Sequence, residues 1–136
     1  METIFGEYTY SDDKALLNID KTCELLATTY WANSRSREKT IKAIENSLCI
    51  GIYKNKEQVG FARIVTDHAT IYWLCDVIVD EKHRKQGLGK KLIEVITTME
   101  ELQGISGLLA TRDAHGLYEK YGFAKVDNYM RKPVTV

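Results

Sequence analysis

The sequence predicts a single α/β domain of 136 residues, in which a mixed antiparallel and parallel sheet is flanked by about four helices. Three observations lead to this fold class. Residues 49–65 form a β-hairpin pattern, with two apolar runs joined by a short polar turn. A buried strand, a glycine-containing loop and an amphipathic helix then follow one another over 74–99. The short apolar run at 107–111 completes a βαβ unit, which requires a parallel strand pair with a right-handed crossover.

The N-terminal half is expected to read βααβββ. Alternating aromatic and polar residues indicate the first strand, and apolar residues at helical spacing indicate the helices. Ser36 is suited to be the N-cap of the second helix. The predicted elements are a strand at 3–10, helices at 16–30 and 36–47, hairpin strands at 49–53 and 59–65, and a long strand at 70–79.

The C-terminal half continues with a helix at 87–102 and a buried strand at 107–111. Asp113 is expected to cap a helix at 114–121, and Gly122 is expected to close that helix at its C′ position. Two short strands, at 124–127 and 129–132, are predicted to follow.

The loop before the helix at 87–102 carries cations where a helix start disfavours them. Unpaired N–H groups and the positive end of the macrodipole lie there, so each cation costs about 0.3–1 kcal/mol. An anion held by the N–H groups beside Gly87 and Gly89 would account for these cations, which indicates a phosphate-binding loop. A solvated basic turn, balanced by Asp80 and Glu81, is the alternative. The basic residues are His83, Arg84, Lys85, Lys90 and Lys91.

Two common nucleotide motifs do not fit this loop. G-x-G-x-x-G requires glycine where Leu92 stands, and the P-loop pattern requires glycine where Arg84 stands. Residues 84–89 (RKQGLG) instead resemble the [RQ]-x-x-G-x-[GA] signature of the GNAT superfamily of acyl-CoA-dependent N-acyltransferases. Residues 117–123 (LYEKYGF) resemble the L-Y-x-x-x-G-F segment that closes the family's acyl-CoA site. The predicted order of elements is similar to the GNAT fold over essentially the whole chain.

This resemblance implies an N-acetyltransferase that transfers an acetyl group from acetyl-CoA to a primary amine of a small molecule or peptide, by direct attack in a ternary complex. A non-catalytic acyl-CoA-binding module, which senses the coenzyme or docks a partner protein, is the alternative. Many relatives carry an asparagine before the L-Y segment; here Thr111 or His115 would replace it. The implied coenzyme-binding residues are Val77, Ile78, Val79, Arg84, Lys85, Gln86, Gly87, Leu88, Gly89, Lys90, Thr111 and His115.

Two residues are candidates for catalysis. Tyr118 matches the family's tyrosine that donates toward the thiolate sulfur, and a phenol of pKa about 10 can protonate a thiolate of pKa about 8.5. Periodicity alone would make Tyr118 an aromatic core residue. Asp76 lies within an apolar strand, where a buried carboxylate is costly unless it is paired, hydrogen-bonded or functional. It is therefore either a general base, acting directly or through water, or an anchor for the N-terminal arm.

The acceptor side is less determined. Tyr30, Trp31 and Arg35 interrupt the helical pattern between the first two helices, a break that borders the substrate cleft in the GNAT family. Aromatic walls and an arginine would suit a small amine that also carries a carboxylate. Ordinary surface packing explains the same residues equally well.

Charge and composition exclude several classes of protein. The chain has 19 Lys and Arg and 19 Asp and Glu, so it lacks the basic excess of a nucleic-acid binder. No stretch reaches the roughly 18 apolar residues of a membrane span, and residues 1–10 lack the apolar core of a signal peptide. We expect a soluble, cytoplasmic protein with one N-acetyltransferase domain over 1–136. A strand edge at 129–132 would allow a homodimer.

The three cysteines indicate neither disulfides nor a metal site. Cys23, Cys49 and Cys75 are an odd number without a C-x-x-C pair, and the histidines supply no ligand set. We interpret them as buried apolar residues in a reducing compartment. A nucleophilic role for Cys75 is the alternative.

Overall fold

The computed structural model describes residues 1–134 and has a six-stranded sheet with the strand order β1-β2-β3-β4-β5-β6. Neighbouring strands from β1 to β5 are antiparallel, and β5 and β6 are parallel, which confirms the predicted mixed sheet and βαβ unit. The strands are β1 (Glu2–Phe5), β2 (Tyr8–Ser11), β3 (Leu48–Lys54), β4 (Glu57–Thr66), β5 (Ile71–Val79) and β6 (Ser106–Leu108).

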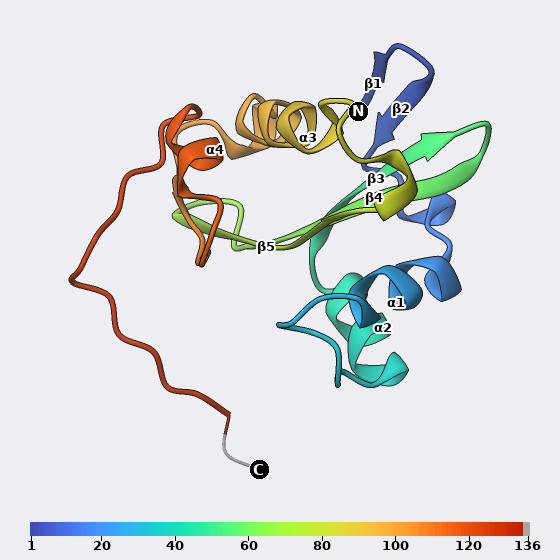
Figure 1. Ribbon diagram of the computed structural model, residues 1–136. Helices are drawn as coiled ribbons and strands as arrows, with labels where there is room; N and C mark the ends of the chain where they lie inside the picture. The colour runs from blue at the N-terminus through green and yellow to red at the C-terminus, as the bar shows by residue number, and fades with distance from the viewer. Residues whose placement is uncertain (135–136) are drawn as a thin grey trace.

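Helices cover both faces of this sheet. Helix α3 lies on one face, and α1 and α2 lie on the other (Figure 1). The helices are α1 (Ile19–Ala27), α2 (Arg37–Glu45), α3 (Leu88–Thr97) and α4 (His115–Glu119), with 3-10 turns η1 (Lys14–Leu16), η2 (Glu81–His83) and η3 (Glu100–Leu102). Among residues 1–134, no helix combines the length and the apolar character that a bilayer span requires.

Each helix layer encloses its own apolar cluster. The cluster under α3 includes Tyr10, Ile52 and Leu92, all fully buried. The cluster under α1 and α2 includes Leu26 and Phe61. Because successive side chains of a strand point to opposite faces of the sheet, one strand can contribute to both clusters.

The N-terminal elements differ from the prediction in two places. Residues 3–10 form two strands rather than one, because Gly6 adopts a φ of +60° and turns the chain between Phe5 and Tyr8. The helix predicted over 16–30 is shorter: Asn18 caps its start by accepting a hydrogen bond from the Lys21 N–H at 3.0 Å, and α1 ends at Ala27. Ser36 caps α2 as predicted, accepting from Lys39 N–H.

The helix predicted over 87–102 ends at Thr97. The side-chain amide of Gln103 donates to the carbonyl oxygens of Thr97 and Met99, both at 2.9 Å, and so satisfies acceptors that the helix leaves free. The following residues form the separate turn η3, which keeps Leu102 buried. This turn explains why the apolar pattern continues past the helix end.

The last two predicted strands are wrong. The structure shows no strand between 109 and 134, and the strand predicted at 107–111 is limited to Ser106–Leu108. Residues 124–134, which we call the tail, leave the body of the domain after α4 (Figure 1). Tyr129 stacks on Trp73 with a centroid separation of 5.7 Å, whereas the Met130 side chain is 94% exposed. The tail pairs with no strand and lies outside the sheet, although β6 is the edge strand.

Candidate active site

A β-bulge in β5 organises the site. Cys75 pairs with Arg63 and Ile78 pairs with Phe61, so Asp76 and Val77 together lie opposite one residue of β4. Asp76 has a φ of +53°, a left-handed conformation that aspartate tolerates better than most residues.

This extra residue changes the alternation of side chains along β5. Tyr72 and Leu74 pack in the cluster under α3, as do Val77 and Val79 after the bulge. Ile78 packs in the cluster under α1 and α2. The Asp76 side chain therefore lies on the face of the sheet covered by α1 and α2.

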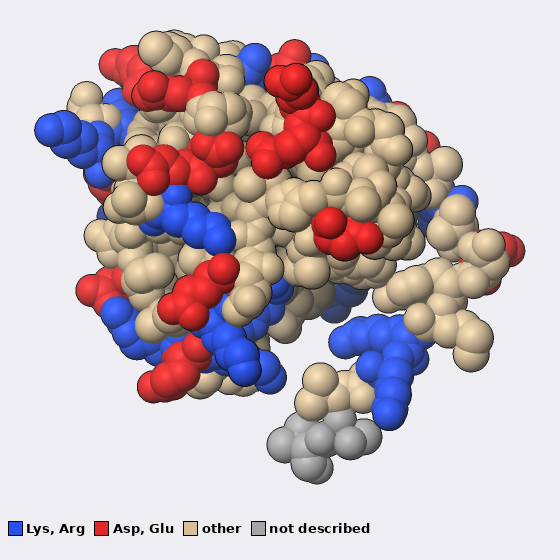
Figure 2. Space-filling view, turned by 180° about the vertical axis from the view of Figure 1, so that it is seen from behind, with Lys and Arg blue, Asp and Glu red and all other residues tan. Residues whose placement is uncertain are grey.

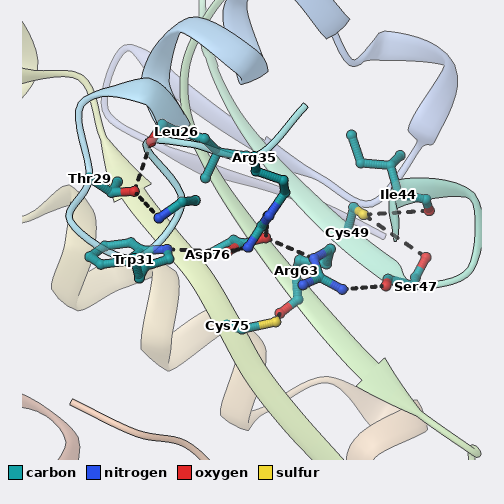
Figure 3. A network of polar contacts seen from close by, with 11 residues as sticks. Leu26, Thr29, Trp31, Arg35, Ile44, Ser47, Cys49, Arg63, Cys75 and Asp76 are labelled. Atoms are coloured by element: carbon teal, nitrogen blue, oxygen red, sulfur yellow. Dashed lines mark hydrogen bonds and ion pairs between the residues drawn. The ribbon is translucent and has the colours of Figure 1, made fainter. Parts of the chain in front are cut away.

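On that face Asp76 is the centre of a hydrogen-bond network (Figure 3). Arg35 donates from both terminal nitrogens, at 2.7 and 3.2 Å, and Arg63 donates from Nε at 2.8 Å. Trp31 donates from Nε1 at 3.2 Å. The Asp76 side chain is only 1% exposed, so this carboxylate is buried and fully supplied with donors.

The network fixes the charge of Asp76. Burial acts most strongly, to raise the pKa of Asp76, but the hydrogen bonds and charges of Arg35 and Arg63 together outweigh it and hold the pKa below its ordinary value. The carboxylate is therefore ionised at neutral pH. Both of its oxygens already accept hydrogen bonds. This geometry fits a structural anchor, which is one of the two roles that the sequence left open for Asp76; the other role is the general base.

The three residues assigned to the acceptor side lie in the loop between α1 and α2. Trp31 and Arg35 are held by Asp76, and Tyr30 meets Trp31 edge to face at 5.0 Å. The guanidinium carbon of Arg112 lies 3.5 Å from the Tyr30 ring centroid. Arg35 thus ties this loop to β5, and Arg112 joins the loop to the segment before α4.

Beyond the bulge, one edge of β5 has no neighbouring strand within residues 1–134. Strand β6 pairs only with Ile71, Tyr72 and Trp73, and the chain diverges from β5 after Leu108. The main chain of Val77, Ile78 and Val79 therefore has no strand partner on that side within residues 1–134. Extended ligands commonly bind such an edge through main-chain hydrogen bonds.

The loop predicted to bind phosphate leads directly into α3. Gly87 is the N-cap residue, with a φ of +78°, and makes no side-chain cap. The first turn contains no acidic residue, and Lys91 N–H is the first to bond back, to the Gly87 carbonyl. The N–H groups of Leu88, Gly89 and Lys90 therefore make no intrahelical hydrogen bond, and anion binding at this loop stays a prediction. Around them Arg84, Lys85 and Gln86 are exposed.

The N-terminal hairpin supports this loop from behind. The buried Tyr10 hydroxyl donates to the Leu88 carbonyl at 2.8 Å. The Tyr8 hydroxyl lies 3.0 Å from Nδ1 of His83 and 3.3 Å from Oε1 of Gln86. These contacts were not predicted, because nothing in the spacing of 8 and 83 along the chain indicates that the two residues meet.

Tyr118 lies on α4 and is half-buried against Phe123, with a centroid separation of 5.9 Å. Burial, and then the nearby Asp113 and Tyr30, raise the pKa of its phenol. The phenol therefore keeps its proton at neutral pH and can act as an acid.

The segment before Tyr118 is arranged differently from the prediction. Asp113 does not cap α4: Ala114 is the N-cap residue and makes no side-chain cap hydrogen bond, and the Thr111 hydroxyl accepts from Ala114 N–H at 3.1 Å. His115 is the first residue of α4 and is half-buried. Gly122, with a φ of +93°, closes the helix at C′ as predicted.

Cys75 does not resemble an activated nucleophile. Burial raises the pKa of its thiol to about 11, so the thiolate is scarce at neutral pH. All three cysteines are free.

Two arginines of this region were missed. Arg63 stands in the apolar run of the second hairpin strand, and a buried arginine requires a carboxylate partner. Asp76, in the adjacent predicted strand, was the evident candidate. No comparable signal pointed to Arg112, whose contact with Tyr30 depends on the tertiary fold.

Known acetyltransferases resemble this chain in sequence. A model of the acetyltransferase (GNAT) domain matches residues 45–125. A candidate acetyltransferase of Gibberella zeae is 29% identical over 139 residues, covering 85% of this chain and 77% of that protein. GCN5-related N-acetyltransferase 2 of Arabidopsis thaliana is 35% identical over 72 residues, which cover 52% of this chain and 28% of that protein.

Solved structures show the same fold. The crystal structure of a candidate GNAT acetyltransferase from Xanthomonas campestris has a TM-score of 0.91 and 36% identity, covering 96% of each chain. A GNAT family acetyltransferase from Elizabethkingia anophelis, with acetyl-CoA bound, has a TM-score of 0.69 and 20% identity, covering 90% of this chain and 80% of that one. The family model covers more than half of the chain, and we conclude that this protein belongs to the GNAT acetyltransferase family.

Proposed function

We propose that the protein is an N-acetyltransferase that transfers an acetyl group from acetyl-CoA to a primary amine by direct attack. The observation that carries this proposal is the edge of β5 at 77–79, which pairs with no strand within residues 1–134 because β6 reaches only Ile71, Tyr72 and Trp73. The predicted phosphate-binding loop follows this edge along the chain, and Tyr118 lies on α4, which follows β6. The Elizabethkingia relative, which binds acetyl-CoA, supports the choice of cosubstrate.

The residues present fit acetyl-CoA. Free N–H groups of Leu88, Gly89 and Lys90 would hold its diphosphate, and the left-handed Gly87 places them there without a competing side-chain cap. When bound, acetyl-CoA supplies the thioester that the amine attacks. The N–H groups at 77–79 would bond the pantetheine and polarise the thioester carbonyl.

Tyr118 would act as the general acid. Its raised pKa keeps the phenol protonated until the C–S bond of the thioester breaks; the phenol then donates its proton to the departing sulfur, and the tyrosinate regains a proton from the nitrogen of the attacking amine. Asp76 would act as an anchor, because Arg35, Arg63 and Trp31 occupy both of its oxygens. The acceptor amine would enter beside Tyr30.

The test is a panel of amines and peptides with thiol release as the readout, applied to the wild type and to Tyr118→Phe. We expect Tyr118→Phe to lower kcat by about 10²- to 10⁴-fold while the calorimetric Kd for acetyl-CoA stays unchanged. Tyr121→Phe is the matched control, because Tyr121 packs against the same apolar cluster.

An unchanged kcat in Tyr118→Phe would remove this residue from the mechanism. Tight binding of acetyl-CoA without thiol release from any amine would indicate instead a non-catalytic acyl-CoA-binding module.

A further inference from the structure

The guanidinium group of Arg112 lies against the face of the Tyr30 ring, with 3.5 Å between the guanidinium carbon and the ring centroid. Arg112 lies in the segment before α4, Tyr30 lies in the loop between α1 and α2, and both side chains are exposed. At this separation the planar guanidinium group stacks on the ring, and its N–H groups point outward in its own plane. The stack therefore presents hydrogen-bond donors to the solvent.

These donors have no anionic partner in the described part of the chain. Two lysines also lie over aromatic rings, and each of them pairs with a carboxylate. These ion pairs are Lys54 with Glu7 at 3.3 Å and Lys91 with Glu94 at 2.9 Å. Arg112 makes no ion pair within residues 1–134, although Asp113 is its neighbour along the chain. Its charge is therefore available to an anion from solution.

Both members of the stack are held in place by other contacts. The turn that contains the arginine is fixed by Ala114 N–H, which donates to the Thr111 hydroxyl at 3.1 Å. Tyr30 meets Trp31 edge to face, and Trp31 donates from Nε1 to the buried carboxylate of Asp76 at 3.2 Å. An anion that binds a guanidinium group already positioned in this way costs less side-chain entropy than one that binds a freely moving arginine.

The stack lies near the proposed general acid. Tyr30 is close enough to Tyr118 to contribute, after burial and Asp113, to the raised pKa of the Tyr118 phenol. Thr111, which precedes Arg112, lines the same cavity of about 560 Å³ as Tyr118. A small molecule whose amine reacts beside Tyr118 would therefore have a second group within reach of the stack.

The charges behind the loop at 28–36 also favour an anion there. Arg35 and Arg63 share the single carboxylate of Asp76, so this network has one more positive than negative charge. On the back of the molecule, acidic side chains gather most densely toward the end that carries α3, whereas acidic and basic side chains are mixed toward α1 and α2 (Figure 2). The electrostatic field on the acceptor side is thus the more favourable one for a negative group.

We propose that Arg112, stacked on Tyr30, binds a carboxylate carried by the acceptor amine, so that the acceptor is an amino acid. The inference rests on the proposed function, because it assigns the class of acceptor. The edge of a guanidinium group matches the two oxygens of a carboxylate, and one such group compensates one negative charge, whereas a phosphate group carries nearly two. Arg35 does not provide this site, because both of its terminal nitrogens already donate to Asp76.

The test compares amino acids with their amides as acceptors, with thiol release as the readout. The probes are the common L-amino acids, β-alanine and 4-aminobutyrate, each paired with its amide. We expect Arg112→Gln to raise KM for an accepted amino acid about tenfold or more and to change KM for its amide less than about twofold. Comparing variants on the same compound cancels the difference in amine basicity between the acid and its amide.

Two further variants sharpen the comparison. Arg112→Lys should restore only part of the loss, because lysine keeps the charge but lacks the planar pair of donors. Arg37→Gln is the matched control, because Arg37 is an exposed arginine on α2 that pairs with Asp20 on the surface. Amino acids and amides used equally well by the wild type, or a preference for amino acids that Arg112→Gln keeps, would overturn the inference and leave acetyl transfer in place.

A binding experiment separates this inference from the proposed function. The same compounds are titrated by calorimetry into the protein saturated with coenzyme A, which carries no acetyl group, so no turnover contributes. We expect an amino acid to bind about tenfold or more weakly to Arg112→Gln than to the wild type or to Arg37→Gln. Equal Kd values in Arg112→Gln and the wild type, or no binding of any amino acid, would overturn the inference. Binding that depends on Arg112 without thiol release would refute acetyl transfer and support the carboxylate site.

Discussion

Replacing Asp76 by asparagine tests the network that holds the α1–α2 loop on the sheet. The substitution keeps the size of the side chain but removes the charge that compensates Arg35 and Arg63. Their side chains are 19% and 15% exposed, so water replaces only part of the lost interaction. Removing one partner of a buried ion pair costs about 3–5 kcal/mol, and two arginines are affected here. We expect a loss of unfolding free energy in that range.

The assay is equilibrium unfolding in urea, with the m-value compared between variants to confirm that the same structure unfolds. Asp20→Asn is the matched control, because Asp20 pairs with Arg37 on the surface and such a pair contributes about 0–1 kcal/mol. A cost below about 1 kcal/mol for Asp76→Asn would refute the anchoring role.

The pH dependence of stability gives an independent check on the same residue. Because the folded pKa of Asp76 is lowered, its contribution is fully present above the unfolded pKa of about 3.9 and is lost as the pH falls through the folded value. The difference in stability between the wild type and Asp76→Asn should therefore narrow only under strongly acidic conditions. A gap that closes between pH 7 and pH 5 would contradict the ionised, paired state.

Three further outcomes follow from the loop and from Tyr118. Gly87→Ala should lower the free energy of unfolding by about 1–2 kcal/mol and weaken coenzyme binding, because Gly87 has a φ of +78°. Gly89→Ala should be neutral or stabilising. Urea unfolding and calorimetry compare the two variants. Tyr10→Phe should cost about 1–3 kcal/mol in urea unfolding, since the Leu88 carbonyl loses its buried donor. The rate of thiol release should rise with pH as the amine deprotonates and should fall only above about pH 10, because the pKa of Tyr118 is raised; a fall below pH 8 would exclude Tyr118 as the acid.

The parts of the fold that were predicted correctly are those in which one local signal decides the structure. The strand, loop and helix around Gly87 have a clear change of period, and the helix start has no competing cap. The end of α3 was missed because the apolar spacing continues past the helix into η3. The hydrogen bonds that the Gln103 side chain donates to the carbonyl oxygens of Thr97 and Met99 depend on the folded structure. The turn at Gly6 was missed because residues 3–10 were interpreted as one strand, whereas Gly6 adopts a positive φ and reverses the chain.

The parts of the site that were missed depend on contacts between distant segments. The sequence shows an arginine at 63 and an aspartate at 76, each within an apolar run, but only the register of β4 and β5 shows that they are neighbours. Tyr8 reaches His83 across the sheet edge, and Arg112 reaches Tyr30 between two loops. The tail was assigned two short strands, although a strand forms only where another strand accepts its hydrogen bonds.

The bulge in β5 makes Asp76 an extra residue, which regular pairing of β5 with β4 does not need. If this one residue were absent, Tyr72, Leu74, Val77 and Val79 would keep the face they occupy now, and the strand would alternate regularly. The apolar packing of β5 therefore does not require Asp76, and the cost of losing it arises from the arginines left without a counter-charge. A chain lacking residue 76, with both arginines also replaced by neutral residues, should retain the scaffold while the loop that carries Tyr30 is released.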